Sequence, residues 1–237
     1  MKLRIQKYIS ECGVLSRRAA EKAIEERRVK VNGVLAEIGM TIDDIDDVVE
    51  LDGKPVLKTT DSKIYLLLNK PAGVLSAVSD DRGRLTVTDL LSDLGRRVYP
   101  AGRLDLDSEG ALICTDDGEF ANLVMHPSNK CEKVYVVHAA GHVSREALNE
   151  LNNMKELDGE RIAKVKVTVT ERHQTHTVLQ FVLHEGKNRQ IRRMCDAAGV
   201  KLTQLKRIAV GAVKLGNLKS GQWRTLTREE IRSFKKQ

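Results

Sequence analysis

The sequence predicts an α+β protein with a small N-terminal domain of two helices and short strands, followed by a larger domain with a mixed, mainly antiparallel β-sheet. Two observations predict this architecture. Apolar side chains recur at helical spacing within residues 1–28, whereas short runs typical of strands follow one another from residue 63 onward. The length of 237 residues suits one large domain or two unequal ones.

The N-terminal elements follow from local patterns. The first helix is predicted from an apolar stripe that Gly13 ends: Ile5, Tyr8, Ile9 and Cys12. Ser16 is placed to cap a second helix, SRRAAEKAIEERR. The segments VKVNG and VVELDG are typical of strands, with a turn at Asn32 and Gly33. Because LKTTDSK at 57–63 is polar and unpatterned, we expect the linker there, with domains at 1–60 and 64–237.

The larger domain is predicted to be rich in strands. These are KIYLLLN, VLSAV, ALICT, KVYVVHA, IAKVKVTVT and TVLQFVLH. Helices are expected at 118–125, around 144–152 and at 187–199, the last with one apolar and one basic side and a stop at Gly199. A further helix at TREEIRSF opens with a capping box, in which Glu230 stands three residues after Thr227.

Basic side chains are concentrated towards the two ends of the chain. Residues 1–33 hold 9 basic and 4 acidic side chains and residues 183–237 hold 14 and 4, within a formal net charge of +7. Such surfaces favour a polyanionic partner, because each Lys or Arg near a phosphate releases counterions on binding. Aromatic residues, at 3%, are too few for a broad base-stacking platform.

Several other classes of protein are excluded. No apolar run approaches the roughly 20 residues that cross a bilayer, and the N-terminus lacks the apolar stretch of a signal peptide. We therefore expect a cytoplasmic protein with no membrane partner. The four cysteines form no C-x-x-C pair, which argues against a zinc site or a disulfide framework. His173 and His176 lack a third ligand, so we expect both at the surface and no metal site.

The most unusual stretch is GRLDLDSEGALICTDDG at 102–118, which gathers carboxylates before an apolar strand. Five residues stand at positions 1, 3, 5, 6 and 12 of a calcium-binding EF-hand loop: Asp105, Asp107, Glu109, Gly110 and Asp116. An EF-hand needs a helix on each side, whereas Pro100 and Gly102 interrupt the entry and ALIC is typical of a strand. Two interpretations of this stretch remain, a solvated acidic turn and a functional loop.

Four motifs in order resemble the RsuA family of pseudouridine synthases. They are NKPAG at 69–73, GRLDLDSEG at 102–110, KVY at 133–135 and EGKNRQIRRM at 185–194, and the resemblance covers nearly all of residues 64–237. Residues 1–60 resemble the RNA-binding domain first described in the fourth small-subunit ribosomal protein. The resemblance implies a catalytic domain with the pseudouridine synthase fold, which isomerises a uridine after extracting it from folded RNA, without a cofactor.

The resemblance also implies roles for individual residues. Asp105 is the catalytic aspartate, Lys187 its basic partner, and Tyr135 the ring that lies against the extracted base. The carboxylate either attacks covalently or stabilises and deprotonates the sugar, and the sequence leaves both routes open. Substrate contacts are expected from Arg103, which fills the vacated space, from Ile191 on the pocket wall, and from Asn69, Lys70, Arg189 and Arg192. For Asn69 and Lys70 a purely structural turn is the alternative.

The expected partner is ribosomal RNA, bound by a chain that we expect to be a monomer. In the N-terminal domain, the predicted RNA contacts are Arg17, Arg18, Arg27, Arg28, Lys30 and Asn32. NRQIRRMCDAAGV and KSGQWRTLT resemble the large-subunit members of the family, which favours 23S over 16S rRNA as the substrate. The alternatives are a 16S-specific synthase of the same family and a non-catalytic RNA-binding or ribosome-assembly protein.

Overall fold

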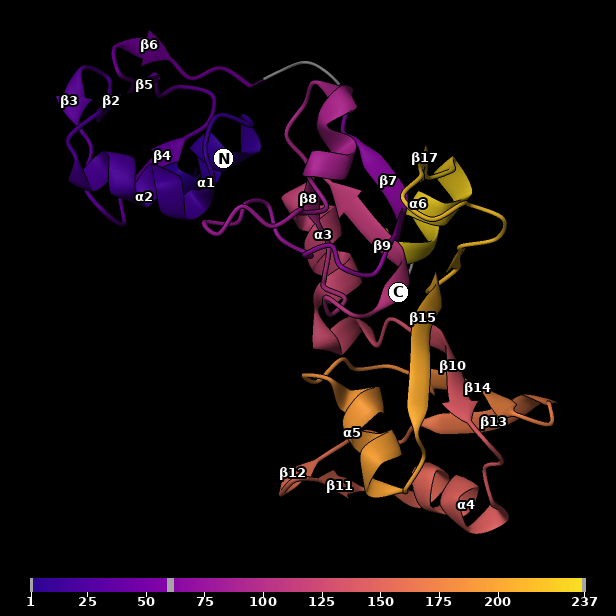
Figure 1. The fold of residues 1–237 in the computed structure, drawn as a ribbon. Helices are drawn as coiled ribbons and strands as arrows, with labels where there is room; N and C mark the ends of the chain where they lie inside the picture. The colour runs from indigo at the N-terminus through magenta and orange to yellow at the C-terminus, as the bar shows by residue number, and fades with distance from the viewer. Residues whose placement is uncertain (1, 59–61, 236–237) are drawn as a thin grey trace. The chain divides into compact units, whose positions relative to one another are not determined.

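The computed structural model describes residues 2–58 and 62–235. The chain divides into two compact units whose boundary along the sequence lies between Lys63 and Ile64, apart from the short segment Asp116–Gly118 (Figure 1). Part of the predicted linker, residues 59–61, lies outside the described residues. Within the described ranges, no helix is both long and apolar enough to span a bilayer.

The first unit combines two helices with short strands. The apolar stripe of the first helix is buried, and the Ser16 hydroxyl accepts a hydrogen bond from the backbone N–H of Ala19, which caps the second helix as predicted. One sheet has the strand order β3-β2-β5-β6, and β1 pairs with β4. The elements are β1 (Lys2–Arg4), α1 (Ile5–Glu11), α2 (Arg17–Glu25), β2 (Val29–Val31), β3 (Val34–Leu35), β4 (Thr41–Asp43), β5 (Val49–Leu51) and β6 (Lys54–Pro55).

The second unit is built on a mixed sheet with the order β13-β14-β10-β15-β9-β7-β17, in which β16 also pairs with β15 and β8 with β9. Its strand pairs are antiparallel except β15 with β9, so the predicted mainly antiparallel sheet is confirmed. The strands are β7 (Tyr65–Lys70), β8 (Tyr99–Pro100), β9 (Glu109–Thr115), β10 (Lys133–Ala140), β13 (Lys166–Arg172), β14 (His176–Leu183), β15 (Leu202–Val210), β16 (Val213–Lys214) and β17 (Trp223–Thr225).

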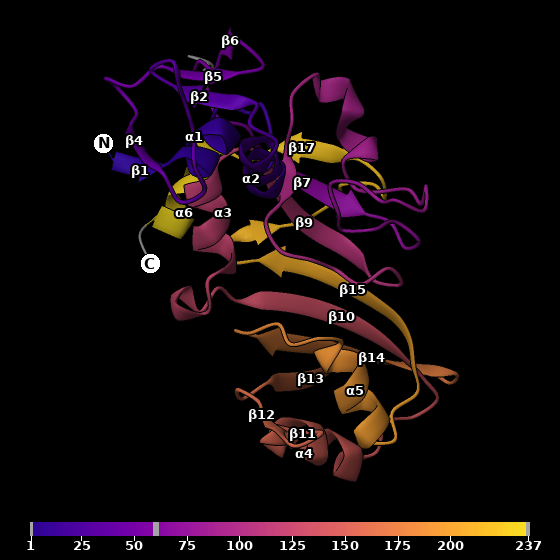
Figure 2. The ribbon, with the colours of Figure 1, turned by 90° about the vertical axis from the view of Figure 1, so that its left-hand side faces the viewer.

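Helices pack at both ends of this sheet (Figure 2). An apolar core that includes Phe181 and Met194 lies where α4 and α5 meet β10, β13 and β14. A second core holds α3 and α6 against β7 and β9, and the rings of Phe120 and Phe234 meet there edge to face, 5.4 Å apart. The remaining elements are η1 (Asp89–Leu94), α3 (Gly118–Met125), η2 (Pro127–Asn129), α4 (Arg145–Asn153), β11 (Glu156–Leu157), β12 (Glu160–Arg161), α5 (Gln190–Ala197) and α6 (Arg228–Lys235).

Two predicted elements differ from the structure. VLSAV is a loop with a single bridge from Leu75 to Thr86. It does not join the sheet, because the Ser76 hydroxyl bonds the backbone of Leu104 and the Leu75 N–H donates to the carbonyl of Leu85. The basic helix begins at Gln190 instead of Lys187, because Arg189 has a left-handed backbone with φ 47°. The sequence patterns also miss β15, which carries one of the site residues described below.

Candidate active site

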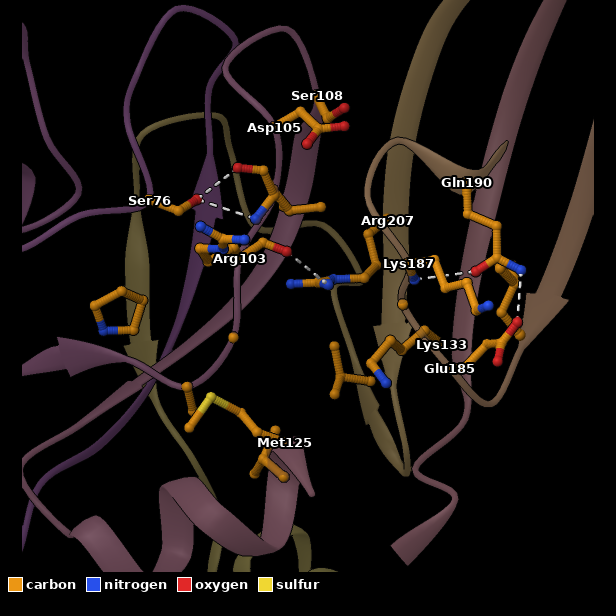
Figure 3. A pocket seen from close by; sticks show the side chains of 18 of the residues that line it. Ser76, Arg103, Asp105, Ser108, Met125, Lys133, Glu185, Lys187, Gln190 and Arg207 are labelled. Carbon is orange, nitrogen blue, oxygen red and sulfur yellow. Dashed lines mark hydrogen bonds between the residues drawn. The ribbon is translucent and has the colours of Figure 1, made fainter. Parts of the chain in front are cut away.

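A cavity of about 600 Å³ opens in the second unit beside β10 and β15 (Figure 3). All three residues predicted to be catalytic line it, namely Asp105, Tyr135 and Lys187. Arg103, Arg189 and Ile191 line it as well, so six of the nine residues predicted for the site meet around one cavity. Its volume is typical of pockets that hold a small molecule.

The loop that carries Asp105 is held through its backbone. The Ser76 hydroxyl donates to the carbonyl of Leu104 at 2.8 Å and accepts from the N–H of the same residue at 3.0 Å. The backbone N–H of Gly73 donates to the carbonyl of Leu106 at 2.7 Å. These bonds fix the residues on both sides of Asp105, whose side chain keeps 33% of its surface exposed. Asp105 is therefore an accessible carboxylate on a rigid support.

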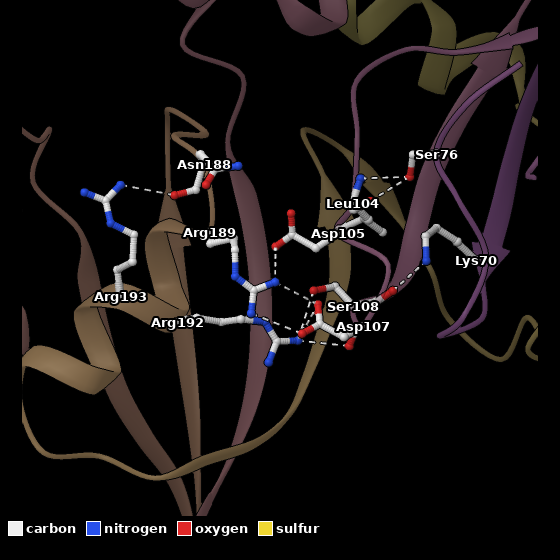
Figure 4. Close-up of polar contacts among 10 residues, drawn as sticks. All are labelled: Lys70, Ser76, Leu104, Asp105, Asp107, Ser108, Asn188, Arg189, Arg192 and Arg193. Carbon is white, nitrogen blue, oxygen red and sulfur yellow. Dashed lines mark hydrogen bonds and ion pairs between the residues drawn. The ribbon is translucent and has the colours of Figure 1, made fainter. Parts of the chain in front are cut away.

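Lys70 lies beside this loop (Figure 4), and neither Lys70 nor Asn69 lines the cavity. The fully buried ammonium of Lys70 donates to the carbonyls of Pro71 at 2.8 Å and Ser108 at 2.9 Å. Burial lowers the pKa of Lys70 to about 8. The amide of Asn69 donates to the carbonyl of Leu218. Both side chains are bound to backbone carbonyls within the unit, which favours a structural role over the expected substrate contacts.

Asp107 joins the loop to α5. Its carboxylate accepts hydrogen bonds from Arg189 at 3.2 and 3.3 Å and forms an ion pair with Arg192 at 3.2 Å. Arg192 also donates to the backbone carbonyl of Asp107 and to the hydroxyl of Ser108. Burial acts to raise the pKa of the Asp107 carboxyl, but hydrogen bonds from Arg189 and the charge of both arginines outweigh it and lower that pKa. We call these contacts the Asp107 clasp.

Lys187 does not form the predicted ion pair with Asp105. Its ammonium donates to the carbonyl of Arg161 and lies 3.5 Å from the carboxylate of Glu160. The physical reason is the turn before α5, where Gln190 accepts from the backbone N–H of Lys187 at 3.1 Å and donates to Glu185 at 2.9 Å. Within the described residues, the cation that comes within 4.0 Å of Asp105 is Arg189.

Tyr135, Ile191 and Arg103 have positions that agree with their expected roles. Tyr135 is half-buried on β10, in register with Phe181 of β14 on one side and Arg207 of β15 on the other. Ile191 is buried on α5 and contributes an apolar wall. Arg103 is exposed at the cavity, on the same loop as Asp105.

Arg207 is the site residue that the sequence patterns miss. It is 4% exposed, and it donates to the carbonyl of Ala111 at 2.7 Å, the hydroxyl of Tyr135 at 3.4 Å and the carbonyl of Arg103 at 3.5 Å. A signal for it exists in the sequence. Alternate residues of β15 face the interior, namely Leu205, Arg207 and Ala209. Arg207 is therefore a charged residue at a position where the alternation of a strand predicts an apolar one.

The acidic stretch does not have the geometry of a calcium loop. A strand begins at Glu109, and Asp107 is already bound by two arginines. Glu109 accepts a hydrogen bond from Gln204 at 3.0 Å. The rings of His173 and His176 stack on each other with centroids 4.2 Å apart. In the described ranges, no group of three or more His, Cys, Asp or Glu side chains is arranged to hold a metal ion.

The predicted RNA contacts of the first unit fall into two groups. Arg17, Arg18, Arg27 and Lys30 are exposed. Arg28 instead binds the Asp52 carboxylate through two nitrogens and also Glu26, and both bonds raise its pKa. The side-chain amide of Asn32 donates to Asp47 and accepts from the N–H of Val48. Arg28 and Asn32 are exposed as well, but both side chains are bound within the unit, so we call the four residues of the first group the exposed basic surface.

Two family models match the chain. The model described as RNA pseudouridylate synthase matches residues 64–197, and the S4 domain model matches residues 3–49. A solved structure described as pseudouridylate synthase aligns with a TM-score of 0.69 and 30% identity, over 98% of this chain and 99% of that chain.

Two curated relatives are similar over almost their whole length. The chain is 40% identical to ribosomal large subunit pseudouridine synthase B of Bacillus subtilis, over 98% of this chain and 95% of the relative. It is 41% identical to an uncharacterized RNA pseudouridine synthase of Aquifex aeolicus, over 98% of this chain and 93% of the relative.

Proposed function

Because the chain belongs to the RNA pseudouridylate synthase family and carries an S4 domain, we propose that it isomerises one uridine of 23S rRNA to pseudouridine, with Asp105 as the reacting carboxylate. The observation that supports this most is that Asp105, on a loop fixed through its backbone, lines the same cavity as Tyr135. We propose further that residues 1–60 anchor the RNA, that residues 64–237 carry out catalysis, and that the chain acts as a monomer.

The chemistry needs few groups, because the reaction exchanges nothing with a cofactor. The bond between N1 of uracil and C1′ of ribose breaks, the base turns, and a bond forms between C5 and C1′. Asp105 acts on the sugar while this happens, either as a nucleophile or as a base. Arg189 lies 4.0 Å from the Asp105 carboxylate, so it is the basic partner that the sequence assigned to Lys187.

The preference for 23S rRNA rests on the resemblance of 188–200 and 219–227 to large-subunit enzymes and on the B. subtilis relative, whose name specifies the large ribosomal subunit. Mapping pseudouridines in the rRNA of a strain that lacks the gene tests this preference. Loss of one site in 23S rRNA is expected. Loss of a 16S site would indicate the alternative specificity, and an unchanged map would indicate a non-catalytic protein.

Replacing Asp105 by Asn tests the catalytic assignment. A neutral amide is a poor nucleophile and a far weaker base, so single-turnover pseudouridine formation should be lost in Asp105→Asn. RNA affinity should remain, since the change removes a negative charge near a polyanion. Asp93→Asn makes the same chemical change at an exposed position outside the cavity and should react at the wild-type rate. An active Asp105→Asn enzyme would refute the assignment.

A further inference from the structure

Arg207 is a buried cation without a counter-ion. Only 4% of the residue is exposed, yet among the residues that the structure describes no carboxylate oxygen lies within 4.0 Å of its guanidinium. Its partners are neutral oxygens of Ala111, Arg103 and Tyr135. Figure 3 shows the side chain reaching into the cavity towards the backbone of Arg103. A positive charge therefore faces the space that receives the substrate.

Such an arrangement lowers the stability of the fold, which indicates that the charge has a function. A buried ion is desolvated, and neutral hydrogen-bond partners offset this less well than an opposite charge does. A neutral side chain of similar length would join the same strands without that cost. The field of Arg207 also acts on its surroundings, because it adds to burial in lowering the pKa of Lys133 on the cavity wall. Together these facts indicate that the cavity receives negative charge at this point.

The reaction supplies such a charge at one stage. When the bond between N1 and C1′ breaks, its electron pair leaves with the base, and the uracil anion spreads this charge over N1, O2 and O4. After the base turns, C5 uses its electron pair to bond C1′, C5 then loses its proton, and N1 takes one up. The charge is absent from the bound uridine and appears as the bond breaks, so a cation beside it lowers the barrier.

We propose that Arg207 is a catalytic residue that stabilises the negative charge of uracil as the glycosidic bond breaks. This inference rests on the proposed function. Arg207 donates to the hydroxyl of Tyr135, whose ring is expected to lie against the base, so the guanidinium lies at the edge of the base site. The arginine keeps its own proton throughout, and either route for Asp105 is compatible with it.

The test varies the stability of the leaving anion. Transcripts of 23S rRNA are made with uridine or with 5-fluorouridine, because fluorine at C5 stabilises the uracil anion. Formation of the carbon–carbon glycosidic bond is then followed under single-turnover conditions by nuclease digestion and mass spectrometry. With 5-fluorouridine, C5 has no proton to lose, so the product keeps its fluorine and takes up water, with the hydroxyl on C6 and the proton on N1. The enzymes are wild type, Arg207→Gln, which removes the charge, Arg207→Lys, which retains it, and Lys206→Gln, whose residue neighbours Arg207 on β15 but does not line the cavity.

With uridine RNA, Arg207→Gln should react about 10²–10³-fold more slowly than wild type, as when a charge-stabilising donor is removed from other active sites. With 5-fluorouridine RNA the deficit should shrink at least about tenfold, because a stable anion needs less help. Arg207→Lys should lie between wild type and Arg207→Gln on both RNAs. Lys206→Gln should match wild type, and RNA affinity should be unchanged in all variants.

Other outcomes overturn the inference. An equal deficit on both RNAs would mean that Arg207 supports the fold of the site, and the Arg207→Lys variant applies the same criterion if Arg207→Gln folds poorly. Weaker binding with an unchanged single-turnover rate would mean that the residue contacts a phosphate. Failure of the proposed function looks different, because wild type itself would then form no pseudouridine in 23S or 16S transcripts.

Discussion

The buried ammonium of Lys70 ties β7 to the loop that carries Asp105. Lys70→Met keeps the length of the side chain but leaves the carbonyls of Pro71 and Ser108 without their donor. The free energy of unfolding should fall by about 1–3 kcal/mol, and kcat should fall with it because the loop loosens. Chemical denaturation and single-turnover assays measure these effects. The exposed Lys164→Met is the control and should change stability by less than about 0.5 kcal/mol.

The same variant predicts a pH dependence. The pKa of Lys70 is lowered to about 8 from 10.5, so between these values the unfolded chain binds the proton more strongly than the folded one does. The stability of the wild type should therefore rise relative to Lys70→Met as pH increases from 8 to 10.5. A constant difference across this range would contradict the lowered pKa.

The Asp107 clasp predicts sensitivity to acid. The pKa of Asp107 lies below its ordinary value of 3.8, so its contribution to stability is complete above that value and is lost as pH falls through the lowered pKa. Between pH 5 and 2, wild type should lose more stability than Asp107→Asn, with Asp93→Asn as the control. At neutral pH, Asp107→Asn should keep measurable activity, since it acts through Arg189 and Arg192. Complete inactivity would indicate a direct catalytic role.

At the scale of residues, the sequence predicts the position of a side chain well where a motif fixes its backbone. It predicts bonding partners less well, because a flexible side chain can reach several of them. Asp105 and Tyr135 line the cavity as expected because loop and strand place their backbones. Lys187 has a flexible stem, and its partners on β12 cannot be identified from the spacing of motifs. Arg207 lies in none of the four motifs, although it is a charged residue on the buried face of β15.

Among the elements, β9 and β15 form the parallel pair that joins two parts of the sheet, and Gly110 of β9 lies opposite Arg207 of β15. A Cβ there would overlap the carbonyl oxygen of Arg207 and lie 2.8 Å from its backbone nitrogen, and the backbone has φ +108°. Gly110→Ala should lower stability by more than the roughly 1–3 kcal/mol of an unfavourable backbone alone, and should impair catalysis by displacing Arg207.

Gly216→Ala is the matched control for this prediction. Gly216 also has a positive φ, +57°, but a Cβ there would meet nothing within 4 Å. Thermal unfolding and single-turnover assays of both variants separate the effect of the backbone from that of the close approach. Equal losses in the two variants would show that the contact between β9 and β15 matters little.

Elements with strong local signals are predicted best. The capping box of α6 forms as expected, with Thr227 and Glu230 exchanging hydrogen bonds, and α3 has the predicted bounds. The segment VLSAV has the composition of a strand, but the hydroxyl of Ser76 and the N–H of Leu75 bind other loops. Such long-range contacts have no counterpart in local periodicity.

For the molecule as a whole, affinity for RNA is expected to depend on the exposed basic surface of the first unit. Arg17→Glu/Arg18→Glu should weaken RNA binding and reduce its dependence on salt, because fewer counterions are released. Stability should change by less than about 0.5 kcal/mol per exposed site. Arg17→Lys/Arg18→Lys keeps the charge and should bind like wild type. Filter binding over a range of salt concentrations measures both effects. Wild-type affinity in the Glu variant would show that this surface does not bind the RNA.

The pairing of β17 with β7 also constrains when the enzyme becomes competent during synthesis. Trp223 lies opposite Leu68, and Asn69 donates to the carbonyl of Leu218, 149 positions further along the chain. When the ribosome has synthesised the last of the four motifs, which ends at residue 194, β17 has not yet been made and β7 lacks its partner on that side. Contacts of such high contact order form late, since loop closure must come first. We therefore expect the nascent chain to remain inactive on RNA until the segment around β17 has emerged from the ribosome.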